Sequence, residues 1–156
     1  MWYYIGAMLR ISKLTDYAIL VMVELARARR EVLSAQLLAE RAHVELPTAS
    51  KVLKLLAGAG LVRSYRGAAG GYAVDRPAAE ISVADIIAAI EGPIAMTECS
   101  VHEGLCTVEA SCHARENWQK ISRAVASALQ QVSLAEMAGT PRGGAIPGLR
   151  IATLNA

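Results

Sequence analysis

The segment from residue 46 to residue 74 constrains the fold most strongly, because a helical pattern changes to a β pattern within it. Pro47 suits the first turn of a helix, where its missing N–H group would have no partner, and Gly58 and Gly60 end that helix. Two short β-prone runs follow at residues 61–66 and 71–74, separated by a turn that contains glycine. The segment therefore predicts a helix followed directly by a β-hairpin.

Two more helices are expected before this segment. Residues 14–30 are mostly apolar, and Ser34 is a suitable N-cap for a second helix. Three helices and a hairpin are typical of a winged helix-turn-helix, so the fold class is mainly α with a small β-hairpin wing. In that fold the third helix enters the major groove of DNA, and the hairpin touches the backbone or the minor groove. We expect Val52, Leu55 and Leu56 to face inward and the polar face of the third helix to contact DNA through Thr48, Ser50, Lys51 and Lys54.

The second half of the chain predicts a binding segment and a dimerisation helix. Ser82 is expected to cap a helix over residues 83–90, followed by a loop of about 18 residues that contains all three cysteines. Residues 113–132 form the next expected helix, whose apolar stripe needs a partner surface. The simplest partner is the same helix of a second subunit, so we expect a homodimer. The stripe consists of Trp118, Ile121, Val125, Ala128 and Val132.

Composition excludes several classes of protein. Apolar residues make up 54% of the 156 residues and the formal charge is only +2, which excludes general disorder. The longest apolar stretch, residues 17–26, is too short for a bilayer, so we expect a cytoplasmic protein without a membrane partner. Residues 8–76 carry 11 Lys and Arg against 6 Asp and Glu, whereas residues 77–156 carry 5 against 8. The basic first half is compatible with a polyanion such as DNA.

The cysteines are the chemical centre of the sequence. Cys99, Cys106 and Cys112 are spaced C-x6-C-x5-C, and soft thiolates of this kind suit an iron-sulfur cluster. Three alternatives remain open: buried cysteines without a role, a zinc site, or a thiol enzyme that uses Cys106 and His102. Zinc sites ordinarily contain tighter pairs of cysteines, and no group at a recognisable spacing orients a thiol for catalysis. We therefore expect no enzyme and no small-molecule substrate.

Taken together, four motifs resemble the IscR/NsrR-like family of dimeric winged-helix repressors that carry an iron-sulfur cluster. The resemblance covers roughly residues 8–138 and is closest to the subgroup that regulates genes of the SUF iron-sulfur assembly system. Residues 1–7 precede it, as either a disposable extension or residues outside the native protein. The motifs are LRISKLTDYA at 9–18, the wing at 60–72, the cysteine loop, and SLAE at 133–136.

The resemblance implies a ligand set and DNA contacts. Cys99, Cys106 and Cys112 would bind the cluster, with 2Fe-2S favoured over 4Fe-4S. In IscR-like members a histidine ligand occupies the position that is Arg115 in this chain. The resemblance therefore favours Asp16, from the first helix of the other subunit, as the fourth ligand. His113 is the main alternative, followed by His102 and Glu116. Arg66 falls at a groove-reading position, and Ser12 and Lys13 are expected to contact phosphate.

These features predict a DNA-binding transcription repressor that senses iron-sulfur cluster status and controls SUF genes. Its expected divisions are an extension at 1–7, a DNA-binding domain at 8–80, a cluster loop and dimerisation helix at 81–138, and a flexible tail at 139–156. Cluster state would set the spacing of the two recognition helices and so the affinity for the operator. The alternatives are a nitric-oxide or redox sensor with a zinc or thiol site, or a thiol enzyme with a vestigial DNA-binding domain.

Overall fold

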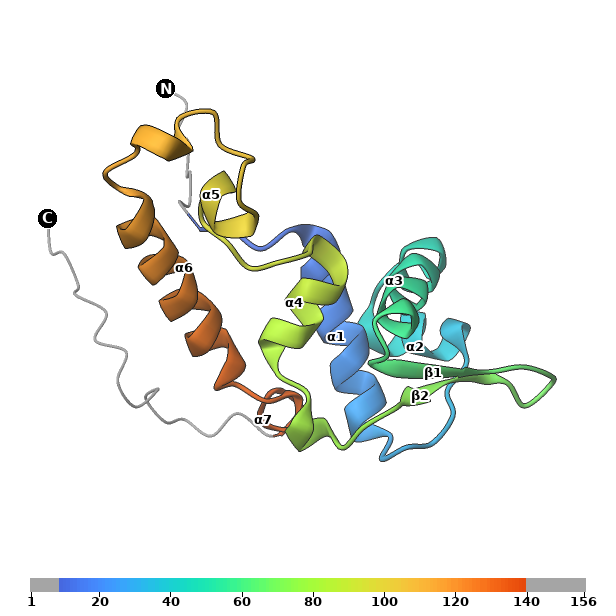
Figure 1. The fold of residues 1–156 in the computed structure, drawn as a ribbon. Helices are drawn as coiled ribbons and strands as arrows, with labels where there is room; N and C mark the ends of the chain where they lie inside the picture. The colour runs from blue at the N-terminus through green and yellow to red at the C-terminus, as the bar shows by residue number, and fades with distance from the viewer. Residues whose placement is uncertain (1–8, 140–156) are drawn as a thin grey trace, which may run out of the picture.

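A computed structural model describes residues 9–139 as a helical protein with one antiparallel hairpin (Figure 1). The extension expected at 1–7 and the tail expected at 139–156, apart from Gly139, lie outside the described residues. In chain order the elements are α1 (Lys13–Arg27), α2 (Ala35–Ala42), α3 (Leu46–Gly58), β1 (Val62–Tyr65), β2 (Gly71–Val74), the 3-10 helix η1 (Ala78–Glu80), α4 (Val83–Glu91), α5 (Glu98–Val101), the 3-10 helix η2 (Glu109–Ser111), α6 (Arg115–Gln130) and α7 (Leu134–Ala138).

Helix α1 lies at the centre of the fold and contacts α2, α3, α4 and α7. Its buried face includes Ala18, Val21, Met22 and Leu25, all with no exposed surface. Leu20, within the apolar part of α1, is nevertheless 41% exposed. The helix ends at Arg27 and not at Arg30, since Arg29 and Arg30 adopt positive φ angles that do not continue a right-handed helix.

Helices α2 and α3 form the helix-turn-helix. Ser34 caps α2 as expected, and His43 ends it in the left-handed conformation with a φ of 54°. Pro47 occupies the first turn of α3, where no helical partner for an N–H group exists. The inward face of α3 consists of Ala49, Val52, Leu53 and Leu56. The expectation that Leu55 faces inward is wrong: the helical period places Leu53 on the buried face and leaves Leu55 exposed.

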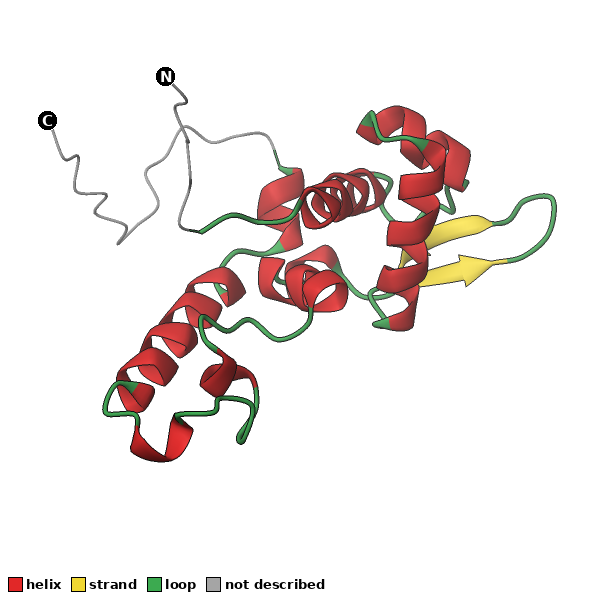
Figure 2. Cartoon of the chain, turned by 90° about the horizontal axis from the view of Figure 1, so that it is seen from above, coloured by secondary structure: helices red, strands yellow, loops and turns green. Residues whose placement is uncertain are grey.

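The predicted hairpin is confirmed, with Val62 opposite Val74 and Tyr65 opposite Gly71. The connection between α1 and α2 runs along it, because the N–H and C=O groups of Leu33 both bond to Tyr72. Gly71 permits this approach, since a Cβ atom there would collide with the Leu33 carbonyl. The wing is thus fixed to the helical core at its base and projects freely at its tip (Figures 1 and 2).

The C-terminal elements return to the same core. A capping box of Ser82 and Asp85 begins α4, and Leu134 of α7 is fully buried. Helix α6 contacts α4 and α5, and the backbone at Ser82 pairs with that at Ser133. The segment expected to be a loop without structure of its own contains the short helices α5 and η2. Helix α6 begins at Arg115, so His113 lies before the helix that was expected to include it.

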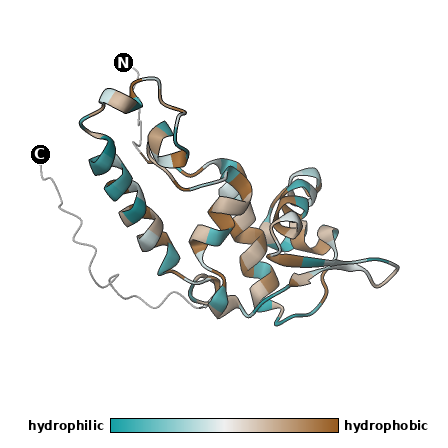
Figure 3. Cartoon of the chain, in the orientation of Figure 1, coloured by the Kyte–Doolittle hydropathy of each residue, from teal (hydrophilic) through white to brown (hydrophobic). Residues whose placement is uncertain are grey.

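The structure confirms a mainly α fold with a β-hairpin wing. Hydrophobic residues gather where α1, α3 and α4 meet, and hydrophilic ones cover much of α6 (Figure 3). Among residues 9–139, no helix has both the length and the hydropathy needed to cross a bilayer.

Candidate DNA-binding surface and cysteine segment

Helix α3 presents a polar outer face. Lys51 and Lys54 are exposed, whereas Thr48 and Ser50 are half-buried at the edge of the same face. The four predicted DNA-contact residues of α3 therefore lie on one accessible surface. Leu55 adds an apolar group to this surface, and an apolar side chain can contact the methyl group of a thymine.

The wing carries two arginines in different environments. Arg66 is exposed in the turn after β1, where Gly67 has a φ of 103° and its carbonyl accepts a hydrogen bond from the Gly70 N–H group at 2.9 Å. Arg63 lies within β1 and pairs with Asp75 at 2.8 Å. No pattern in the sequence marks Arg63, because its partner Asp75 directly follows β2 and only the folded hairpin brings the two together. Among the described residues, no acidic side chain pairs with Arg66.

The N-terminus of α1 is held by a carboxylate that the sequence analysis missed. Ser12 caps the helix by accepting the Thr15 N–H group at 3.2 Å. Glu91, at the end of α4, accepts the Ser12 N–H group at 3.0 Å and the Thr15 hydroxyl at 2.5 Å. These bonds, chiefly those from Thr15 and then Ser12, lower the pKa of Glu91. Ser12 thus fixes the helix end, while Lys13 and Asp16 remain exposed beside it.

Replacement of Glu91 by Gln is expected to lower the free energy of unfolding by about 0.5–1 kcal/mol at neutral pH, because a charge-assisted bond at an exposed site is lost. Because the pKa of Glu91 is lowered in the folded state, its ionised carboxylate stabilises that state at pH values above 4.5, the ordinary pKa of the group. This contribution is lost as the pH falls through the lowered pKa. Denaturant unfolding of both proteins from pH 7 to pH 3 measures the effect. The assignment would be contradicted if the difference in free energy of unfolding between the two proteins stayed the same at pH 3. It would also be contradicted if the control Glu80→Gln, at an exposed site, lowered the free energy of unfolding equally.

The three cysteines are free thiols in different surroundings. Cys99 lies in α5 and is 7% exposed, and its sulfur lies 3.2 Å from the hydroxyl oxygen of Thr97. Cys106 and Cys112 are half-buried on either side of η2. We call residues 96–114, which contain all three, the cysteine segment.

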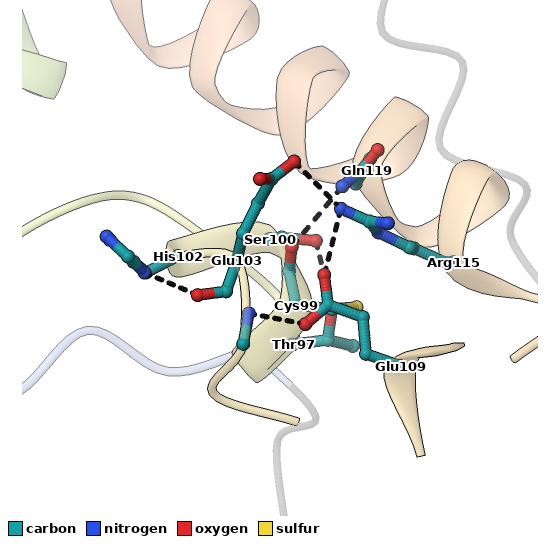
Figure 4. Close-up of polar contacts among 9 residues, drawn as sticks. Thr97, Cys99, Ser100, His102, Glu103, Glu109, Arg115 and Gln119 are labelled. Carbon is teal, nitrogen blue, oxygen red and sulfur yellow. Dashed lines mark hydrogen bonds and ion pairs between the residues drawn. The ribbon is translucent and has the colours of Figure 1, made fainter. Parts of the chain in front are cut away.

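Arg115 joins two points of the cysteine segment to the start of α6 (Figure 4). Its Nη2 atom lies 2.8 Å from Glu109 Oε1 and 3.1 Å from Glu103 Oε1. One turn later, the Gln119 side chain donates to the Cys99 carbonyl at 3.3 Å. Arg115 is the residue at the position where the resemblance places a histidine ligand, and the structure shows it in ion pairs.

The described residues do not gather three or more His, Cys, Asp or Glu side chains into a group that could hold a metal ion. Asp16 lies on α1, and His113 is exposed just before α6. The backbone at Cys112 is extended, and both Cys112 and His113 precede α6. The donor chemistry nevertheless fits a soft metal centre, because one short segment supplies three thiols.

Comparison with known proteins identifies the family. Residues 11–140 match the Rrf2 family, whose description is iron-dependent transcriptional regulator. The chain belongs to the Rrf2 family. This membership confirms the resemblance found in the sequence and shows that the chain is a DNA-binding transcription regulator and not an enzyme.

Individual Rrf2 relatives agree in sequence and in fold. The regulator IscR of Xenorhabdus nematophila is 30% identical over 83% of this chain and 79% of the relative. The solved structure of CymR, the global cysteine regulator of B. subtilis, matches with a TM-score of 0.65 and 32% identity over 83% of this chain and 96% of that one. The structure of T. potens IscR matches with a TM-score of 0.63 and 30% identity over 85% of this chain and 88% of that one.

Proposed function

We propose that this Rrf2 regulator is a homodimeric repressor whose affinity for operator DNA depends on an iron-sulfur cluster, and that it controls genes of the SUF assembly system. Cys99, Cys106 and Cys112 are the proposed ligands. Asp16 of the partner subunit is the proposed fourth ligand, with His113 as the alternative. A 2Fe-2S cluster is favoured over 4Fe-4S.

The attachment of the cysteine segment to α6 is the observation that carries this proposal. The polar side of α6 holds the segment through Arg115 and Gln119. The predicted apolar stripe lies on a neighbouring side of the helix, where Trp118 is 39% and Ile121 is 43% exposed. A second copy of α6 would bury these side chains, so that one helix links the thiols to the dimer interface.

The proposed mechanism connects the cysteine segment of one subunit to the DNA-binding surface of the other through α1. Cys99, Cys106 and Cys112, with Asp16 of the partner subunit, would hold the cluster, which would supply a redox-active and dissociable centre. Glu91 fixes the N-terminus of α1 to α4, and α1 packs directly against α3. A shift of α1 relative to the partner's cysteine segment therefore moves the recognition helix, and two half-sites tolerate little change in spacing.

The exposed surface supports the proposed DNA contacts. Lys51 and Lys54 reach phosphate or base edges in the major groove, with Thr48 and Ser50 beside them. Arg66 at the wing tip enters the minor groove, where an arginine is favoured by the negative potential. Lys13 contacts phosphate at the N-terminus of α1, which Ser12 caps.

A nitric-oxide or redox sensor that uses a zinc or thiol site is the second candidate. It is favoured by the free thiols and by the similarity to CymR, a regulator named for cysteine. The two candidates share the DNA-binding surface and differ in what the cysteine segment binds. Metal analysis therefore separates them.

Protein purified without oxygen is expected to show sulfur-to-iron charge-transfer absorption and to contain iron and acid-labile sulfide in equal amounts. The variant with Cys99, Cys106 and Cys112 all changed to Ala should lose both. A colourless wild type that also fails chemical reconstitution would reject the cluster, and stoichiometric zinc would favour the second candidate.

Changing Lys51 or Arg66 to Ala is expected to weaken operator binding by about 1–3 kcal/mol where a base contact is lost. A lost phosphate contact should reduce the slope of log affinity against log salt by about 1. Binding of an operator duplex, found by footprinting upstream of iron-sulfur assembly genes, measures both quantities. Lys120→Ala, an exposed lysine on α6, is the matched control. Equal affinity of all four proteins at every salt concentration would reject this DNA-binding surface.

A further inference from the structure

One side of α6 holds the cysteine segment at three successive points. Arg115, Gln119 and Ser122 are spaced four and three residues apart, so they lie on one face of the helix. Arg115 pairs with Glu109 and Glu103, Gln119 donates to the Cys99 carbonyl, and the Ser122 hydroxyl accepts the Met96 N–H group at 3.0 Å. Ser122 is itself 4% exposed. The segment is thus anchored from its first residues to η2.

Glu109 makes one contact with α6 and one within the cysteine segment. One carboxylate oxygen binds Arg115, and the other accepts the Gly104 N–H group at 2.6 Å. The Glu109 side chain is only 11% exposed, so these two donors replace much of the water that would solvate a carboxylate at the surface. Gly104, with a φ of 85°, forms the turn that leads to Cys106. Arg115 and Glu109 together therefore fix both the turn before Cys106 and the 3-10 helix before Cys112 (Figure 4).

Charge makes Arg115 distinctive within this region. The cysteine segment contains Glu98, Glu103 and Glu109 but no Lys or Arg, and Arg115 is the first cation after it. Thiolates would add further negative charge to an acidic segment. A guanidinium at its edge offsets that charge and also supplies several donors in a fixed plane.

We propose that Arg115 is the positioning residue of the cysteine segment: it holds the segment on α6 through Glu109 and Glu103 and acts as a charge partner, not as a metal ligand. The anchoring itself does not require a metal. Its consequence for cluster retention rests on the proposed function.

The anchoring is tested first on the metal-free full-length protein by hydrogen-deuterium exchange. In Arg115→Gln the amides of residues 103–112 should exchange about threefold to tenfold faster than in the wild type, because the ion pairs that order them are lost. Glu109→Gln should give the same result, and the double variant should add little, because the two residues act as a unit. Arg115→Lys should be intermediate, since the charge remains without the planar donor geometry. Arg123→Gln, an exposed arginine two turns further along α6, should leave this segment unchanged.

Unchanged exchange of residues 103–112 in both Arg115→Gln and Glu109→Gln would overturn the proposal, as would an equal effect of Arg123→Gln. The second measurement is the release of iron to a chelator from reconstituted protein, which should be about tenfold faster for Arg115→Gln than for the wild type. Equal release rates would overturn the role of Arg115 in cluster retention. Failure of the wild type to take up iron would reject the cluster in the proposed function, and the exchange data alone would then decide the anchoring role of Arg115.

Discussion

The burial of α1 is the interaction on which the rest of the structure depends. Four helices from both ends of the chain pack on it, and Val21, Met22 and Leu25 have no exposed surface. Each such side chain contributes about 1.5–3 kcal/mol when it leaves water. Because α3 and α4 both pack on α1, the recognition helix and the helix that leads to the cysteine segment share one rigid support. The proposed DNA surface and the cysteine segment are therefore both connected to α1.

Polar contacts extend this support to the surfaces themselves. Glu91 joins α4 to the N-terminus of α1, so the connection to the cysteine segment begins at a fixed point. Leu33 and Tyr72 join the base of the wing to the connection between α1 and α2. Arg115, Gln119 and Ser122 hold the cysteine segment on α6. The proposed sensor and the proposed DNA surface are thus connected through short contacts along a single core.

Local chemistry allowed much of the fold to be predicted. Ser34 and Ser82 cap helices as expected, Pro47 begins α3, and the glycines around residues 67–71 form the hairpin turn. These signals act within a few residues and need no knowledge of tertiary contacts. The three cysteines could be identified as a candidate site for the same reason, since their spacing is visible in the sequence. The family could be inferred because the motifs occur together.

What could not be predicted depends on contacts between distant residues. Leu20 lies in the uninterrupted apolar run of residues 17–23, where the hydrophobic pattern does not show which side chain is left uncovered. Glu91 and Ser12 are 79 residues apart, and no local pattern marks their hydrogen bond. Arg115 could be noticed only as a departure from the expected histidine, whereas its role follows from Glu103 and Glu109. The short helix α5 likewise packs against α6, and η2 is joined to α6 by the ion pair of Glu109 with Arg115.

Operator titration of one preparation before and after removal of its iron measures whether the state of the cysteine segment controls affinity for DNA. The two dissociation constants are expected to differ by about tenfold or more, which corresponds to about 1.4 kcal/mol. The triple Cys→Ala variant is expected to keep the affinity of the iron-free form under both conditions. Equal affinity of the loaded and iron-free protein, at the same salt concentration and with the operator still bound specifically, would contradict this control of affinity.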